Sequence, residues 1–161
     1  MTVLVLAGDA KERALIQGAL EKSKHEVFSA ATVGEALALV ESGHPRLVIL
    51  DEDIGADQSD EFVSRIRAGE HPPIYLLALT TSAQSPADVD DALRKPFAAS
   101  DLAARLTLAA RFLALGDSLS EARGQMDSMA LYDPLTSLMN HTAFYRTARG
   151  ELERARRASA P

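Results

Sequence analysis

The sequence contains no cysteine, so the chain can form neither a disulfide framework nor a thiolate metal site. It has no uninterrupted apolar run of about 18 residues, the length at which a segment becomes a candidate membrane-spanning helix. The apolar run at Thr2–Ala7 is too short for the core of a signal peptide, and charged residues follow it at once. We therefore expect neither a membrane segment nor a secreted disulfide scaffold, and we expect a cytoplasmic protein.

An excess of positive charge is also missing. The chain has 23 acidic and 17 basic residues and a formal net charge of −6, which argues against a nucleic-acid-binding surface over its whole length. Hydrophobic residues make up 47% and charged residues 25% of the sequence, which is ordinary for a globular protein. A length of 161 residues fits one compact domain with an extension.

Short apolar segments alternate with helical patterns along the N-terminal two thirds of the chain. Capping patterns predict that helices begin after Asp9 and Thr32, and that a third helix is capped by Ser59 or Asp60. Strands and helices that alternate through short loops predict an α/β fold, in which helices cover both faces of a doubly wound parallel sheet. The five expected strands are Thr2–Leu6, His25–Ser29, Leu47–Leu50, Ile74–Leu79 and a very short one at Leu93.

Polar residues fall where four of these strands end. In open parallel sheets, ligand chemistry collects at the carboxyl ends of the strands. Asp51 directly follows the strongest apolar run, and a hydroxyl residue follows the next strand. We therefore expect one candidate site that is formed by Asp9, Asp51, Thr80 and Lys95.

The order Asp51, Thr80 and Lys95-Pro96-Phe97 resembles the receiver domains of response regulators, over roughly residues 1–115. The resemblance implies a flavodoxin-like fold with a five-stranded sheet and a histidine kinase as partner. It also implies that Asp51 is the phosphoacceptor, that Thr80 is the switch hydroxyl, and that Lys95 pairs with the phosphate. In the family, Mg²⁺ offsets the phosphate charge and is held by the aspartate and an acidic pair after the first strand.

Two features depart from the family pattern. The acidic pair would fall at Ala7-Gly8, which offers no carboxylate. A weaker Mg²⁺ site from Asp9, Asp51 and Asp53 is conceivable, although Asp9 is equally explained as a helix cap. We therefore expect weak or no Mg²⁺ binding, no firmly bound cofactor, and a structural ion pair between Asp51 and Lys95. A phosphorylatable Asp51 is the alternative.

The second departure is a short connection between the Thr80 and Lys95 strands. Residues 81–92 have to replace the family's fourth helix and its loops, and Pro86 opposes a helix there. We expect the fourth helix to be missing or reduced to a turn; the alternative is a short distorted helix at 87–92. Its loss would bare apolar sheet surface, which a second subunit or another protein would cover.

A long helix is expected from Asp101, with Ser100 as its cap, and residues 100–132 form the connector. Apolar residues recur along it at alternating spacings of three and four, the pattern of a two-stranded coiled coil. We expect a parallel homodimer; the alternative is an amphipathic helix that folds back on its own domain. The residues of this seam are Leu108, Phe112, Leu115, Leu119, Ala122, Met126 and Met129.

The segment after the connector reads Asp-x-Leu-Thr-x-Leu-x-Asn and resembles the start of GGDEF domains, the diguanylate cyclases that make cyclic di-GMP. Residues 133–161 would then be the N-terminal fragment of such a domain, ending about one helix into it, with a helix at Thr142–Ala158. No Gly-Gly-[Asp/Glu]-Glu-Phe run occurs in the sequence, so we expect the catalytic part to be absent and no cyclase activity. The motif residues are Asp133, Leu135, Thr136, Leu138 and Asn140.

Together these features predict a regulatory and dimerising receiver of a two-component-type diguanylate cyclase that acts without phosphorylation. A phosphorylated receiver and a protein-binding adaptor are the alternatives.

Overall fold

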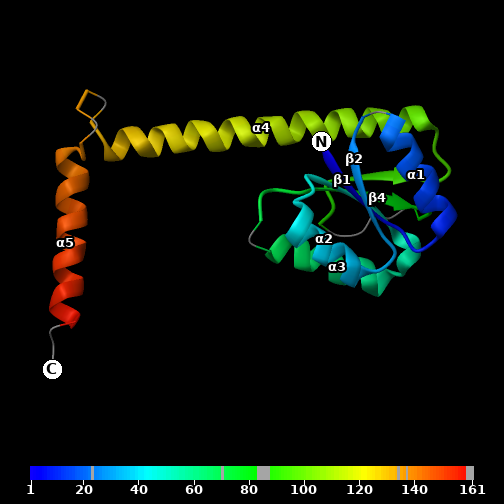
Figure 1. The fold of residues 1–161 in the computed structure, drawn as a ribbon, viewed down its shortest axis with the longest axis horizontal. Coiled ribbons are helices and arrows are strands. Elements are labelled where there is room, and N and C mark those ends of the chain that lie inside the picture. The colour runs from blue at the N-terminus through cyan, green and yellow to red at the C-terminus, as the bar shows by residue number, and fades with distance from the viewer. Residues whose placement is uncertain (23, 70, 83–87, 134, 137, 159–161) are drawn as a thin grey trace. The chain divides into compact units, whose positions relative to one another are not determined.

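The computed structural model describes residues 1–22, 24–69, 71–82, 88–133, 135–136 and 138–158 (Figure 1). The chain divides into two compact units, Met1–Ala114 and Leu115–Pro161, which are described separately below. Within the described ranges, no helix has the combination of length and apolar character that crossing a bilayer requires.

One five-stranded sheet, with all strands parallel, forms the centre of the first unit, in the order β2-β1-β3-β4-β5. The predicted doubly wound fold is therefore confirmed. The strand β2 begins at Glu26, one residue after the predicted start at His25, because its pairing with β1 begins with Thr2 opposite Glu26. The strands are β1 (Thr2–Leu6), β2 (Glu26–Ala30), β3 (Leu47–Asp51), β4 (Tyr75–Thr80) and β5 (Asp91–Arg94).

Helices cover both faces of the sheet (Figure 1). On one face, α1 (Ala10–Lys22) and the first part of α4 (Ala99–Leu131) pack on the strands through Ile16, Leu20, Leu102, Leu106, Ala109 and Leu113. On the other face, α2 (Val33–Gly43) and α3 (Ala56–Ala68) contribute Val33, Ala36, Val40, Phe62, Val63 and Ile66. Each fully buried large apolar side chain stabilises the fold by about 1.5–3 kcal/mol, and these two clusters hold the sheet edge that carries the site.

Two helices begin earlier than predicted. The backbone N–H of Ser59 donates to the carbonyl of Gly55 at 3.0 Å, so α3 already starts at Ala56 and Ser59 is buried inside it. Gly55 has a φ of 109°, a conformation that glycine adopts without strain. In α4, Asp101 Oδ2 accepts from the backbone N–H of Ala98 at 3.0 Å, so Asp101 stabilises the helix start and Ser100 is not its cap. Both predictions were wrong because they took a side-chain cap as the helix start, whereas α3 begins after Gly55 without a side-chain cap and α4 is stabilised by Asp101 from within its first turn.

The connection between β4 and β5 contains no helix among its described residues, 81–82 and 88–90; the remaining part, 83–87 with Pro86, lies outside the described residues. The alternative of a helix at 87–92 is contradicted by β5, which begins at Asp91. The expected bare sheet surface is not found either, because every residue of β4 is buried and Val89 packs on the α2/α3 face.

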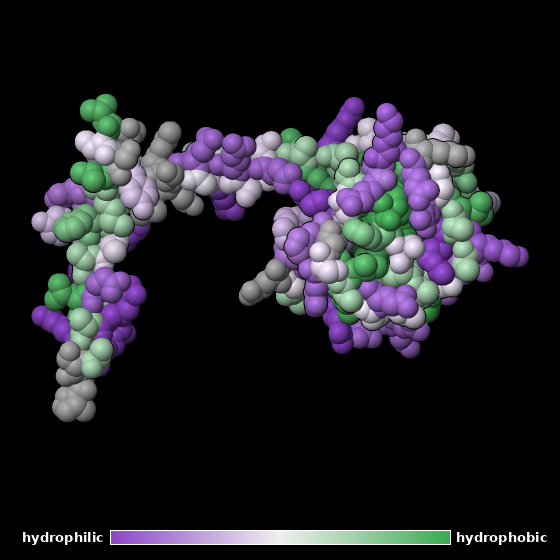
Figure 2. Space-filling view, in the orientation of Figure 1, coloured by the Kyte–Doolittle hydropathy of each residue, from purple (hydrophilic) through white to green (hydrophobic). Residues whose placement is uncertain are grey.

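The second unit continues α4 and ends with α5 (His141–Ala158). Between the two helices, Tyr132 and Met139 form an antiparallel bridge. The predicted helix break at Asp133 and the following helix are both present, with α5 starting one residue before the predicted Thr142. Figure 2 shows apolar and strongly hydrophilic residues next to each other on the surface of α5.

Candidate functional site

The carboxylate of Asp51 lies at the centre of the predicted site. Asp51 is the last residue of β3 and is 1% exposed. Lys95 Nζ donates to Asp51 Oδ1 at 2.7 Å and to Oδ2 at 2.8 Å. Thr80 ends the neighbouring strand β4, and its carbonyl accepts from the backbone N–H of Lys95 at 2.8 Å. The sheet therefore brings Asp51, Thr80 and Lys95 to one edge, and the predicted ion pair between Asp51 and Lys95 is present.

Lys95 contacts two further carboxylates. Its Nζ lies 2.7 Å from Glu12 Oε1 and 2.8 Å from Asp53 Oδ2. Burial lowers the pKa of Lys95, but hydrogen bonds to Asp51, Asp53 and Glu12 outweigh it and raise this pKa above its ordinary value of 10.5. Three carboxylates thus surround one ammonium group, so the cluster carries a formal charge of −2 when all four groups are ionised.

Asp9 does not belong to this cluster. Its Oδ1 accepts from the backbone N–H groups of Lys11 at 2.9 Å and Glu12 at 2.8 Å, which makes it the N-cap of α1. These backbone hydrogen bonds, above all that from Glu12, lower the pKa of the exposed Asp9 carboxyl. The predicted grouping of Asp9 with Asp51 and Asp53 is therefore corrected: oxygen atoms of Glu12, Asp51 and Asp53 lie within 4.8 Å of one another, and Glu12 takes the third place.

The sequence spacing along α1 indicates that Glu12 lies near the site. A capping box would have turned the Glu12 side chain back towards Asp9, whereas here it reaches Lys95. Glu12, Ile16 and Leu20 recur every four residues, and Ile16 and Leu20 are buried against the sheet. Since residues four apart share a helix face, Glu12 begins the stripe that faces the sheet and lies at the strand ends.

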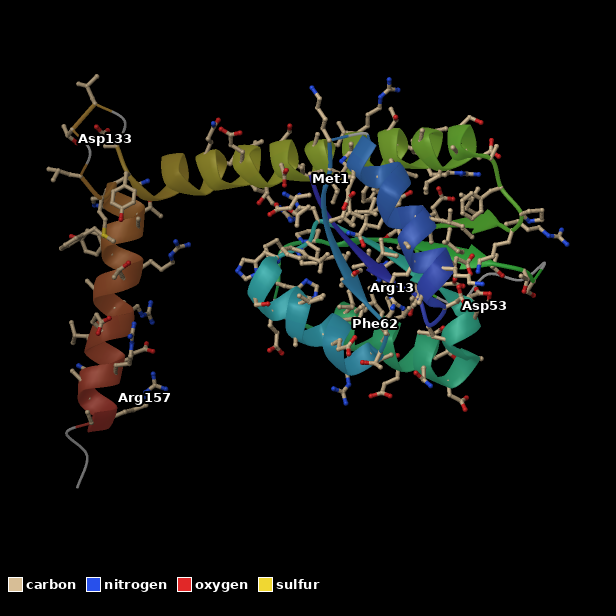
Figure 3. All side chains as sticks on the ribbon, turned by 45° about the vertical axis from the view of Figure 1, so that its right-hand side comes forward. Met1, Arg13, Asp53, Phe62, Asp133 and Arg157 are labelled. Carbon is tan, nitrogen blue, oxygen red and sulfur yellow. The ribbon has the colours of Figure 1, made fainter. Side chains whose placement is uncertain are left out.

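The guanidinium of Arg13 binds backbone carbonyls in the loop that follows β1. Arg13 Nη1 donates to the carbonyl of Ala7 at 2.6 Å and to that of Gly8 at 3.3 Å. Figure 3 shows the side chains of Arg13 and Asp53 around the N-terminal end of α1. The positions at which the family pattern places its acidic pair therefore contribute backbone carbonyls bound to a guanidinium.

The cluster has the oxygen ligands that Mg²⁺ prefers. Glu12, Asp51 and Asp53 could hold such an ion, because their oxygen atoms are close enough to share it. Lys95 Nζ, however, already contacts all three carboxylates. A bound cation would therefore require Lys95 to give up at least part of these contacts. In chemical terms, the site offers a buried carboxylate nucleophile with a lysine beside it.

The residues of the predicted seam are exposed on α4. Leu108 is 50%, Leu115 is 70% and Leu119 is 65% exposed. The face of α4 that packs on the sheet uses other residues, Leu102, Leu106, Ala109 and Leu113. The described seam residues are exposed to different degrees; they are Leu108, Phe112, Leu115, Leu119, Ala122 and Met126, and the side chain of Met129 lies outside the description.

Polar residues of the GGDEF-like motif hold the turn between α4 and α5. Asp133 Oδ1 accepts from the backbone N–H groups of Leu135 at 3.1 Å and Thr136 at 2.9 Å, and from Thr136 Oγ1 at 3.0 Å. These bonds, first that from the Thr136 backbone, lower the pKa of Asp133. Asn140 Oδ1 accepts from the N–H of Ala143 at 2.8 Å and caps α5. The side chains of Leu135 and Leu138 are largely in solvent, with exposed fractions of 94% and 68%.

Comparison with known proteins agrees with this geometry. The family model described as "Response regulator receiver domain" matches residues 3–107. The KDP operon transcriptional regulatory protein KdpE of Escherichia coli (strain K12) is 31% identical over 114 residues, which cover 68% of this chain and 51% of that protein. The transcriptional regulatory protein PmrA of Pectobacterium parmentieri is 34% identical over 140 residues, which cover 81% of this chain and 60% of PmrA. The chain thus spans about half to three fifths of the length of these relatives.

A solved structure shows the same fold. It is that of a response regulator receiver modulated diguanylate cyclase from Pelobacter carbinolicus, with a TM-score of 0.63 and 24% identity. The match covers 73% of this chain and 97% of that one.

Proposed function

This chain belongs to the family of response regulator receiver domains, and we propose that it is the regulatory and dimerising receiver of a diguanylate cyclase. In this proposal the receiver acts through its shape and pairing, without phosphorylation. The carrying observation is that a receiver core, an exposed apolar seam on α4 and the hydrogen-bonded turn at Asp133–Asn140 follow one another in a single chain.

Pairing of two chains would bury the seam. Phe112, Leu119 and Met126 are 56%, 65% and 73% exposed and recur every seven residues. Leu108 and Leu115 follow the same period with an offset of four. In a parallel two-stranded coil, such positions form alternating layers in which each apolar residue inserts between residues of the facing helix. A second copy of the chain is therefore the partner that matches this stripe.

A parallel pair fits the chemistry that the motif implies. Each cyclase domain would bind one GTP, and two domains must face each other to join two GTP molecules. The Asp133 turn would connect the paired helices to α5, whose Phe144 and Tyr145 are 56% and 62% exposed. In a complete cyclase these apolar side chains would pack on the remaining part of the domain.

Independence of phosphorylation is supported by the state of Lys95. Its ammonium already has three carboxylate partners, and the loop at Ala7-Gly8 supplies no carboxylate for a metal ion. A phosphoryl group on Asp51 would have to compete with Glu12 and Asp53 for Lys95. The resting arrangement therefore disfavours the step that drives an ordinary receiver.

Sedimentation equilibrium tests the dimer. We expect the wild-type chain to be a dimer at micromolar concentration and Leu119→Asp to be a monomer, because the substitution places two like charges in one layer of the seam. Ser120→Asp is the matched control, since residue 120 adds the same charge next to the seam. An unchanged mass for Leu119→Asp contradicts the proposed pairing.

One observation favours a second function, that of a phosphorylated receiver. Glu12 brings a third carboxylate to Asp51 and Asp53, so the ligand charge missing at Ala7-Gly8 is partly restored. Titration with beryllofluoride and Mg²⁺, which together imitate the phosphorylated aspartate, separates the two functions. A saturable spectroscopic change that Asp51→Asn abolishes supports the second function, and no change up to millimolar ligand supports the first.

A further inference from the structure

Phe112 contacts both the domain core and the surface on which a second chain would pack. Its ring lies 5.6 Å from that of Tyr75, centroid to centroid, with an interplanar angle of 64°. Such edge-to-face pairs stabilise the position of both rings beyond the effect of burial. Tyr75 is 4% exposed, whereas Phe112 remains 56% exposed. Phe112 thus contacts the core through Tyr75 while more than half of its surface remains exposed.

The position of Phe112 on α4 explains this division. Ala109 and Leu113 lie three residues before it and one after it, and both are buried against the sheet. Leu108 and Leu115, four residues before and three after, are half-exposed or more. Phe112 therefore lies at the border between the packing face of α4 and the seam.

We infer that Tyr75 positions the Phe112 ring for pairing with a second copy of this chain. The inference rests on the proposed dimer. A side chain that is ordered before association loses less conformational freedom when it becomes buried, so the complex is tighter. Two copies that present the same stripe place two Phe112 rings in one layer of an isologous interface. The contact between Tyr75 and Phe112 therefore contributes in both subunits.

The same contact joins the seam to the candidate site. Tyr75 is the first residue of β4 and Thr80 is the last. The strand is buried along its whole length and is paired on both sides, with β3 and β5. A shift of β4 at the site would therefore be passed to the ring of Phe112 along the six buried, paired residues of this strand.

A double-mutant cycle on the dimer dissociation constant tests the inference. We expect Tyr75→Leu to raise this constant by about threefold to tenfold, the range of one aromatic pair, although Tyr75 is buried and lies outside the seam. Tyr75→Phe is the control: it keeps the ring and should leave the constant within about twofold of the wild type. In a Phe112→Leu background, Tyr75→Leu should have less than about a twofold effect.

Equal effects of Tyr75→Leu in the two backgrounds overturn the inference. If Tyr75→Leu does not fold, Tyr75→Met replaces it, because methionine fills irregular buried space. If Leu119→Asp abolishes the dimer but Tyr75→Leu leaves the dissociation constant unchanged, the inference is overturned and the proposed dimer stands. A wild-type chain that is monomeric at every concentration overturns both.

Discussion

Glu12 Oε1 lies 2.7 Å from Lys95 Nζ, which joins the first turn of α1 to the residue that follows β5. Glu12 thereby brings a third carboxylate to the buried Asp51 from a position outside the family's acidic pair. The ammonium of Lys95 takes the place among these carboxylates that a bound cation would need. We therefore expect metal affinity at this site to depend on the competition between Lys95 and an external cation.

Removal of the lysine charge should reveal this competition. Lys95→Met leaves Glu12, Asp51 and Asp53 without a cationic partner, so we expect Mg²⁺ affinity, measured by titration calorimetry, to rise by about tenfold or more. Glu12→Gln added to Lys95→Met should remove most of this gain. Lys11→Met is the control, because Lys11 is an exposed lysine of α1, next to Glu12, and its backbone N–H donates to Asp9. Equal affinities in the wild type and Lys95→Met contradict the competition.

The raised pKa of Lys95 predicts how stability changes at high pH. The group stays protonated in the folded chain above 10.5, its ordinary value, while it loses its proton in the unfolded chain. Its contribution to the free energy of unfolding is therefore complete below pH 10.5 and is lost as the pH rises from there towards the higher folded-state pKa. Urea unfolding at pH 9 to about 11.5 should show a steeper loss for the wild type than for Lys95→Met. Parallel curves for the two proteins would contradict a raised pKa.

The fold could be predicted from the sequence because its central strands are continuous apolar runs. Leu47-Val-Ile-Leu50 is buried on both faces, and such a strand appears as a continuous apolar run. Asp51, Thr80 and Lys95 follow from the same pattern, because parallel strands present their carboxyl ends at one edge.

The exact partners of long polar side chains were not accessible from the sequence. The helix stripe places Glu12 near the strand ends, but whether its carboxylate turns back to Asp9 or reaches Lys95 depends on where β5 ends in space. Arg67 is a second case: its guanidinium donates to the carbonyls of Asp88 at 2.8 Å and Ile74 at 3.2 Å and to Asp90 Oδ2 at 2.8 Å. Arg67 thus binds the short connection before β5 at two residues, Asp88 and Asp90, that follow it in the sequence by 21 and 23 positions.

Loss of Arg67 should therefore destabilise the first unit. Asp90 Oδ2 also accepts from the backbone N–H of Leu76 at 2.7 Å, so Arg67→Met leaves part of a connected network unpaired. We expect the free energy of unfolding to fall by about 1–3 kcal/mol, measured by urea titration. Arg65→Met is the matched control: Arg65 lies on the same helix and makes an exposed ion pair with Glu61, which should contribute about 0.5 kcal/mol or less. Similar losses for both variants would show that the network has no special role.

The turn before α5 gives a prediction for the second unit. Asn140 Oδ1 accepts from the N–H of Ala143 at 2.8 Å, and removal of such a cap typically costs about 1 kcal/mol of helix stability. Asn140→Ala should thus increase amide hydrogen exchange over the first turn of α5 by about fivefold. Asn140→Asp keeps the acceptor and adds a negative charge at the helix N-terminus, so protection should be retained or increased. If alanine and aspartate protect the first turn equally, the helix start is set by the Asp133 turn and not by the side chain of Asn140.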